Sequence, residues 1–174
     1  MSAFWLWFST GLEHITDFNG YDHILFVTLL CIGYTFKLWK KLLLMVTAFT
    51  IGHSLALALS TVGAVEVKQE LIEFLIAFSI LLTAVYHLIN YKKEKAEPGV
   101  ILYSIVLFFG LIHGLGFSYL LKAMLGEEES VFFPLLNFNL GLEAGQLLIV
   151  VMVLAITGLV TNLLKVPVKI YNLI

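Results

Sequence analysis

The sequence has 174 residues, of which 60% are hydrophobic and only 13% charged, and its formal net charge is −2. So few charged residues cannot form the polar shell of a soluble protein, and the near-neutral balance excludes nucleic acid as a partner. The single cysteine, Cys31, excludes an internal disulfide and any cysteine-based metal cage. The composition therefore predicts one membrane-embedded domain, residues 1–174, surrounded by membrane lipid.

Hydropathy in chain order predicts helices. A membrane span needs about 20 mostly apolar residues, or fewer where the bilayer is thin. The first helix, Ala3–Thr16, is shorter and carries Glu13 and His14, so we expect it to be interfacial or partly inserted. The predicted spans are Asp22–Phe36, Leu42–Val62, Leu71–Tyr91, Val100–Leu121 and Phe132–Leu164. The expected fold class is all-α: a polytopic transmembrane helix bundle with five spans plus a short N-terminal interfacial or partly inserted helix.

The charges of the loops alternate along the chain. Lysines occur in every second loop and in the C-terminal tail: Lys37, Lys40 and Lys41, then Lys92, Lys93 and Lys95, then Lys165 and Lys169. The intervening loops are acidic or mixed, and they hold Asp17, then Glu66, Lys68 and Glu70, then Glu127, Glu128 and Glu129. By the positive-inside rule, we expect a multi-pass protein of the cell (inner) membrane with its lysine loops and C-terminus in the cytoplasm.

Ionisable side chains within apolar spans point to function, because each is costly unless it is paired or hydrated. Seven are expected at one depth, in the outer half of the bundle: His14, Asp22, His23, His53, Glu73, His113 and Glu143. Gly110 and Gly114 flank His113 and would let another helix approach it closely. His87 falls towards the cytoplasmic side, and we interpret it as a packing residue.

Several imidazoles with one or two carboxylates suit a divalent transition metal such as Ni, Co or Zn. The predicted metal ligands are His14, Asp22, His23, His53, His113 and Glu143. Asp22 could also orient a ligating imidazole. Simpler roles stay open for other polar residues: Glu73 could reach the interface, Ser54 could bond the backbone, and Asn139 and Gln146 could join helices. By their spacing, Asn139, Glu143 and Gln146 share one helix face.

Motifs along almost the whole chain resemble the HupE/UreJ family of membrane proteins. In order, they are Gly11–Ile15, Gly20–Phe26, Thr47–Leu55, Glu73–Ile80, Phe109–Phe117 and Asn137–Gln146. Members of this family are regarded as nickel or cobalt permeases, so the resemblance implies transition-metal handling. The histidine–aspartate–histidine motif of the family maps onto His14, Asp22 and His23.

Three functions remain open at this stage. The first is a permease for a divalent metal, with its site in the outer half of the bundle. The second is a membrane-embedded zinc-dependent hydrolase or acyl-transfer enzyme acting on a lipid or lipid-linked substrate. There, Glu143, Asp22 or Glu73 would be the general base, and Ser54 or Asn139 would stabilise the oxyanion. The third is an assembly or scaffold subunit. A membrane or extracytoplasmic partner protein is compatible with all three.

Overall fold

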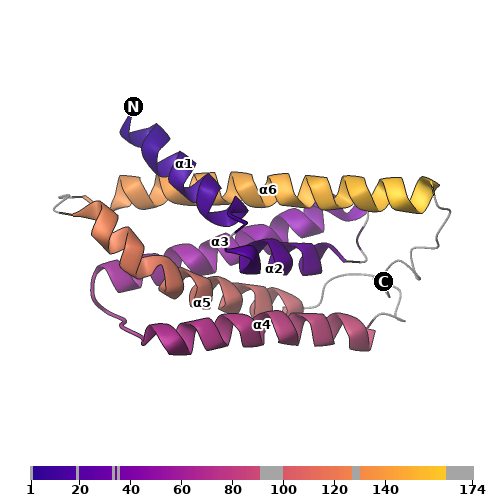
Figure 1. Cartoon of the computed structure of the whole chain (residues 1–174), viewed down its shortest axis with the longest axis horizontal. Coiled ribbons are helices and arrows are strands. Elements are labelled where there is room, and N and C mark those ends of the chain that lie inside the picture. The colour runs from indigo at the N-terminus through magenta and orange to yellow at the C-terminus, as the bar shows by residue number, and fades with distance from the viewer. Residues whose placement is uncertain are drawn as a thin grey trace.

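The computed structural model describes residues 2–18, 20–32, 34, 36–90, 100–126 and 130–163 of the chain. Within these ranges the protein is all-α and has no strand, as predicted (Figure 1). Its helices are α1 (Ala3–Thr16), α2 (Tyr21–Cys31), α3 (Trp39–Thr61), α4 (Gln69–Asn90), α5 (Val100–Leu125) and α6 (Phe132–Leu163), and a 3-10 turn, η1 (Phe36–Leu38), precedes α3. The short helix expected at Ala3–Thr16 has these bounds in the structure.

Four helices are long and apolar enough to cross a membrane, namely α3, α4, α5 and α6. The structure differs from the prediction at the expected span Asp22–Phe36. It contains the 11-residue helix α2, which is about 16 Å long and covers about half of a bilayer core. The structure therefore supports four long apolar helices plus one shorter apolar helix, and not five full spans.

The four long helices run along one axis, and α1 crosses α6 obliquely (Figure 1). At the left end of this view α3 and α5 finish, and α4 and α6 begin; we call it the near end. Glycines follow both finishing helices there, with φ of 74° at Gly63 and 55° at Gly126, a conformation that other residues adopt at a cost. Lys92, Lys93, Lys95, Glu127–Glu129, Lys165 and Lys169 lie outside the described residues, so the sidedness of the bundle stays a prediction.

Glycine contacts bring two pairs of helices into backbone contact. On α5, a Cβ at Gly110 would collide with the carbonyl oxygen of Phe49, and one at Gly114 would collide with that of His53. Because only glycine fits, α3 and α5 pack together at the level of His53 and His113, as the small-residue spacing predicted. Gly11 of α1 meets the backbone of α6 in the same manner.

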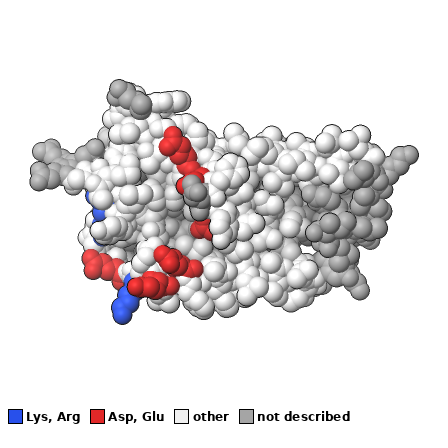
Figure 2. All heavy atoms as spheres, viewed as in Figure 1, with Lys and Arg blue, Asp and Glu red and all other residues white. Residues whose placement is uncertain are grey.

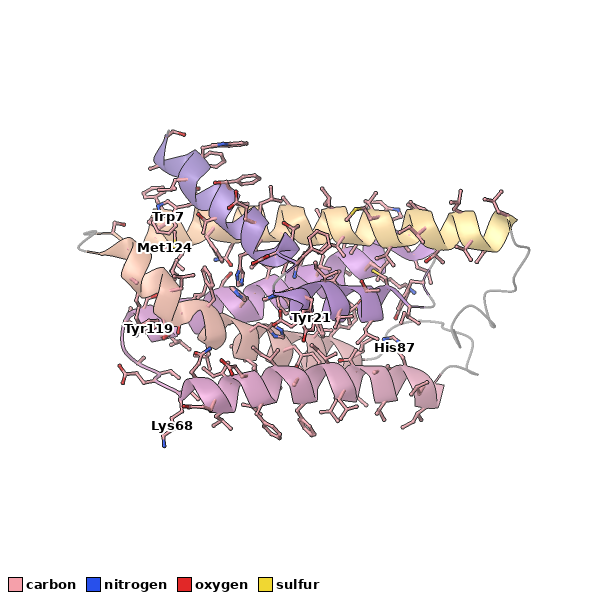
Figure 3. All side chains as sticks on the ribbon, viewed as in Figure 1. Trp7, Tyr21, Lys68, His87, Tyr119 and Met124 are labelled. Carbon is pink, nitrogen blue, oxygen red and sulfur yellow. The ribbon has the colours of Figure 1, made fainter. Side chains whose placement is uncertain are left out.

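The outer faces of the long helices are apolar. On α4, Phe74, Phe78 and Leu81 are exposed, whereas Ser79 and Thr83 are buried. This pattern is the reverse of that of a soluble helix and matches a helix whose outer face is surrounded by lipid. Figure 3 shows the apolar side chains projecting outward along the lower edge of α4.

Candidate metal centre

Four helices bring one carboxylate and four histidines together towards the near end of the bundle. His14 comes from the last turn of α1, Asp22 and His23 from the first turn of α2, His53 from α3 and His113 from α5. We call these five residues the histidine cluster.

The cluster contains two overlapping triads that share His23. In each triad, His14–His23–His53 and Asp22–His23–His113, one potential ligand atom per residue lies within 4.8 Å of the others. The ring centroids of His14 and His23 are 4.7 Å apart, and those of His23 and His113 are 4.8 Å apart. The structure thus brings together five of the six predicted ligands, and their binding of a metal stays a prediction.

Several nitrogens in the cluster are buried without a hydrogen-bond partner. This holds for Nε2 of His14 and for Nε2 of His113. His53 is 0% exposed and His113 is 2% exposed. A buried polar atom without a partner costs about 1–3 kcal/mol. A cation bound between the rings would supply the missing partner, so the donor set fits a metal ion.

The hydrogen bond of His113 defines its tautomer. Its Nδ1 lies 3.0 Å from the carbonyl oxygen of Phe109, and a carbonyl oxygen only accepts, so Nδ1 carries the proton. In the neutral ring, Nε2 then carries a lone pair. That nitrogen faces Oδ2 of Asp22 at 3.6 Å, and a carboxylate oxygen also only accepts. Two lone pairs facing each other at this distance are the arrangement that a shared cation would stabilise.

Asp22 also orients a second imidazole. Its Oδ1 lies 3.1 Å from Nδ1 of His23, and its carboxylate lies in the first turn of α2, where a negative charge is favourable. A carboxylate paired with one nitrogen of a histidine fixes the ring and directs the other nitrogen towards a metal. Asp22 can therefore act both as a ligand and as an orienting group, as the sequence suggested.

Aromatic rings enclose the cluster. Phe117 lies 4.0 Å from His14 between ring centroids, and Phe138 stacks on His53 at 6.0 Å. Phe49 lies 5.4 Å from His113. The low dielectric of these apolar walls strengthens electrostatic interactions within the cluster.

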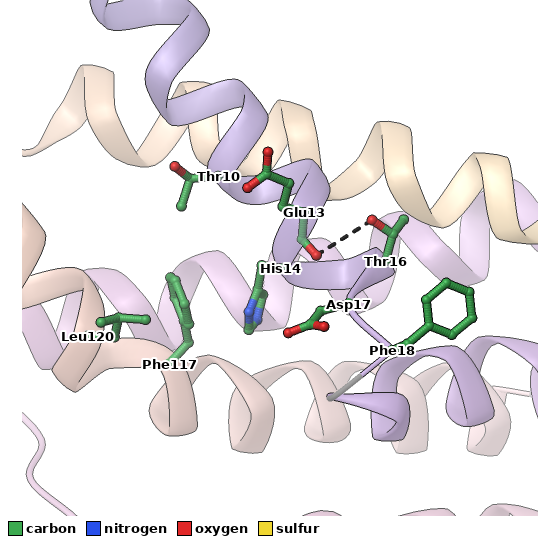
Figure 4. Close-up of a pocket in the computed structure, with 8 residues that line it drawn as sticks. All are labelled: Thr10, Glu13, His14, Thr16, Asp17, Phe18, Phe117 and Leu120. Carbon is green, nitrogen blue, oxygen red and sulfur yellow. Dashed lines mark hydrogen bonds between the residues drawn. The ribbon is translucent and has the colours of Figure 1, made fainter.

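A surface pocket of about 630 Å³ leads to one edge of the cluster. Its lining includes Glu13 and Asp17 with His14 and Phe117, and the ring of His14 lies between Phe117 and Asp17 (Figure 4). In the space-filling view, the visible acidic side chains lie in the left half of the molecule, together with lysines, and none is visible among the described residues of the right half (Figure 2). Negative charge around such an opening raises the local concentration of cations.

Glu143 does not belong to either triad. Its Oε1 instead accepts a hydrogen bond of 2.7 Å from Thr47 of α3. Glu73 is exposed and accepts a bond from Gln69. His87 is buried beside Tyr86 towards the other end of α4, away from the cluster (Figure 3).

The groups suggested for oxyanion stabilisation already have partners. Ser54 donates a 2.7 Å hydrogen bond to the carbonyl oxygen of Thr50, one turn earlier. The side-chain nitrogen of Asn139 donates to the carbonyl oxygen of Leu135. The Ser54 hydroxyl and one N–H of Asn139 are thus bonded within their own helices, although both residues line a pocket of about 300 Å³.

Thr47 is a residue of this region that the sequence reasoning missed. It lies one turn before Thr50 and two turns before Ser54 on α3. The spacing alone would have placed Thr47 near the face of these two residues. Its partner on α6 follows only from how the two helices cross.

Together, the long apolar helices and the buried histidine cluster define a multi-pass membrane protein with a candidate site for a transition metal. The model of the HupE / UreJ protein family matches residues 1–172. The chain belongs to this family, which is linked to nickel and cobalt uptake. Comparison with curated proteins and with solved structures gave no match.

Proposed function

We propose that this protein is a membrane permease for a divalent transition-metal ion of the nickel and cobalt class, with the histidine cluster as its binding site. The observation that carries the proposal is the pair His113 and Asp22, whose facing acceptor atoms are 3.6 Å apart. Two ligands bound tetrahedrally at about 2.0–2.1 Å from an ion are separated by about 3.4 Å. The spacing therefore suits one shared ion.

The surroundings of the cluster support capture from the near end. The pocket at Glu13 and Asp17 would attract the hydrated ion, and His14 lies at the boundary between this pocket and the buried rings. Replacement of water by imidazole nitrogens would then retain the ion, because imidazole suits nickel and cobalt well. The ion is the cargo of this process and not a resident cofactor.

The zinc-hydrolase alternative has less support, because Ser54 and Asn139 donate to the backbone. A scaffold role leaves the orphaned nitrogens of the cluster unexplained, since packing alone supplies no partner for them.

The test compares two buried histidines in the purified full-length protein. His23 belongs to both triads, so His23→Ala should lower Co²⁺ affinity at least about 100-fold, and it should abolish Co²⁺ uptake into proteoliposomes. His87→Ala removes a histidine that is also buried but lies outside the triads, and it should leave binding and uptake unchanged. Equal uptake by the two variants would refute the permease proposal.

A further inference from the structure

A polar seam between α3 and α6 continues from the cluster towards the middle of the bundle. Thr47 donates to Glu143 at 2.7 Å, and the Thr50 hydroxyl lies 3.0 Å from the side-chain oxygen of Gln146. Both pairs connect the same two helices. Thr47 lies six residues before His53 and Thr50 lies three before it, about 9 Å and 5 Å along the helix axis, so the seam adjoins the cluster and extends away from it.

The hydrogen bonds of Thr50 determine which atom of Gln146 lacks a partner. The hydroxyl of Thr50 has one proton but lies near two acceptors: the carbonyl oxygen of Val46 at 3.1 Å and the oxygen of Gln146 at 3.0 Å. Exchanging the amide oxygen and nitrogen of Gln146 lets the Thr50 hydroxyl keep both contacts, because the nitrogen then donates to Thr50, which donates to Val46. The remaining amide atom, buried without a partner, is then an oxygen.

Asn139 lies on the same helix face and connects it to the cluster. Its amide nitrogen donates to the carbonyl oxygen of Leu135, and its side chain is hydrogen-bonded to His53. Glu143 follows Asn139 after four residues and Gln146 after seven, which is about 6 Å and 10 Å along the helix axis. These three residues therefore lie along one face of α6 that begins beside the cluster.

We propose that Glu143 and Gln146 form a second cation station, made of oxygen ligands, midway along the bundle. The inference rests on the proposed function, because the station would receive the ion that leaves the histidine cluster, with Asn139 between the two sites. Gln146 is 0% exposed, so its orphaned oxygen is directed into protein. Oxygen ligands suit harder ions such as Mn²⁺, whereas imidazoles suit Co²⁺ and Ni²⁺. The two sites can therefore be probed separately.

The experiment uses the purified full-length protein in detergent, with Mn²⁺ followed by electron paramagnetic resonance and Co²⁺ by visible absorption. Glu143→Gln should weaken Mn²⁺ binding at least 10-fold and leave the first, tightest equivalent of Co²⁺, held by the histidine cluster, unchanged. The new amide oxygen can still accept from Thr47, so folding should be retained. His113→Ala should weaken Co²⁺ binding and leave Mn²⁺ binding unchanged. Glu70→Gln, which neutralises an exposed carboxylate on α4, is the matched control for loss of charge and should change neither.

Two results would overturn the second cation station. One is equal Mn²⁺ affinity in the wild type and in Glu143→Gln. The other is loss of Co²⁺ binding at the histidine cluster in Glu143→Gln, which would place Glu143 in that site. Gln146→Leu provides a second variant that leaves the carboxylate intact, and it should also weaken Mn²⁺ binding. Failure of the wild type to bind Co²⁺ at the cluster, with the Mn²⁺ result intact, would refute the proposed function instead.

Discussion

Replacing Gly114 by alanine should separate α3 from α5 at the level of the histidine cluster. The new Cβ would collide with the carbonyl oxygen of His53 and would lie 2.8 Å from Cβ of Ala56. Carbon atoms in contact stay about 3.5–4.0 Å apart, so the two backbones must separate by roughly 0.7 Å or more. Neither backbone can avoid this by rotating a side chain.

The magnitude of the effect follows from this displacement. Overpacking of this kind costs about 1–3 kcal/mol of stability. Distances between a metal and its ligands tolerate about ±0.2 Å, so displacing His53 relative to His113 should weaken Co²⁺ binding about 10–100-fold, the usual range for a disturbed supporting contact. The loss of metal affinity should therefore be evident even if the helices stay folded.

Thermal unfolding followed by tryptophan fluorescence measures the stability, and isothermal titration with Co²⁺ measures the affinity. Gly116→Ala is the control on the same helix, because its Cβ would meet only side-chain atoms, Cγ2 of Ile72 at 3.3 Å and Cδ1 of Ile76 at 3.5 Å. If Gly114→Ala binds Co²⁺ as tightly as Gly116→Ala, the cluster does not depend on the close approach of α3 and α5.

Three further outcomes are expected. Neutralising the pocket charges with Glu13→Gln and Asp17→Asn should slow Co²⁺ association several-fold at low ionic strength and very little in about 1 M salt, where charges are screened. Stopped-flow absorption measures the association rate, and an equal slowing at both salt concentrations would argue against electrostatic steering. Ser54→Ala should leave metal content unchanged and cost about 1 kcal/mol or less, because its hydroxyl bonds only its own helix; element analysis and thermal unfolding check it. Cysteines introduced in Lys37–Lys41 and in Gly126–Ser130 should be labelled from opposite sides of the membrane, and labelling of both from one side would contradict the topology.

The histidine cluster could largely be predicted because ionisable groups are costly in apolar helices. His53 and His113 stand out in otherwise apolar stretches, and counting residues from the helix ends places them at similar depth. The glycines beside His113 indicated a close neighbour, and the neighbour is α3. These inferences need only depth and residue size, which the sequence supplies directly.

The parts of the prediction that the structure does not show depend on helix length and on how helices face one another. The sequence from Ile32 to Phe36 stays apolar, so hydropathy extended the expected span to Phe36, whereas α2 ends at Cys31. Helical phase correctly grouped Glu143 with Gln146, but phase within one helix does not show which residues of another helix it meets. The contact of Glu143 with Thr47 depends on the crossing of α3 and α6, which no local pattern encodes.

The packing of Gly11 against the backbone of Phe138 has a consequence for the biogenesis of the protein. The helix that carries His14 is synthesised before α6, and its packing surface on α6 follows only after more than a hundred further residues. At about 5–20 residues per second, that interval lasts on the order of ten seconds. During it, the first helix must wait at the membrane without its partner. The four-histidine arrangement is therefore completed only once α6 has been inserted, so a nascent chain that stalls before α6 would lack it.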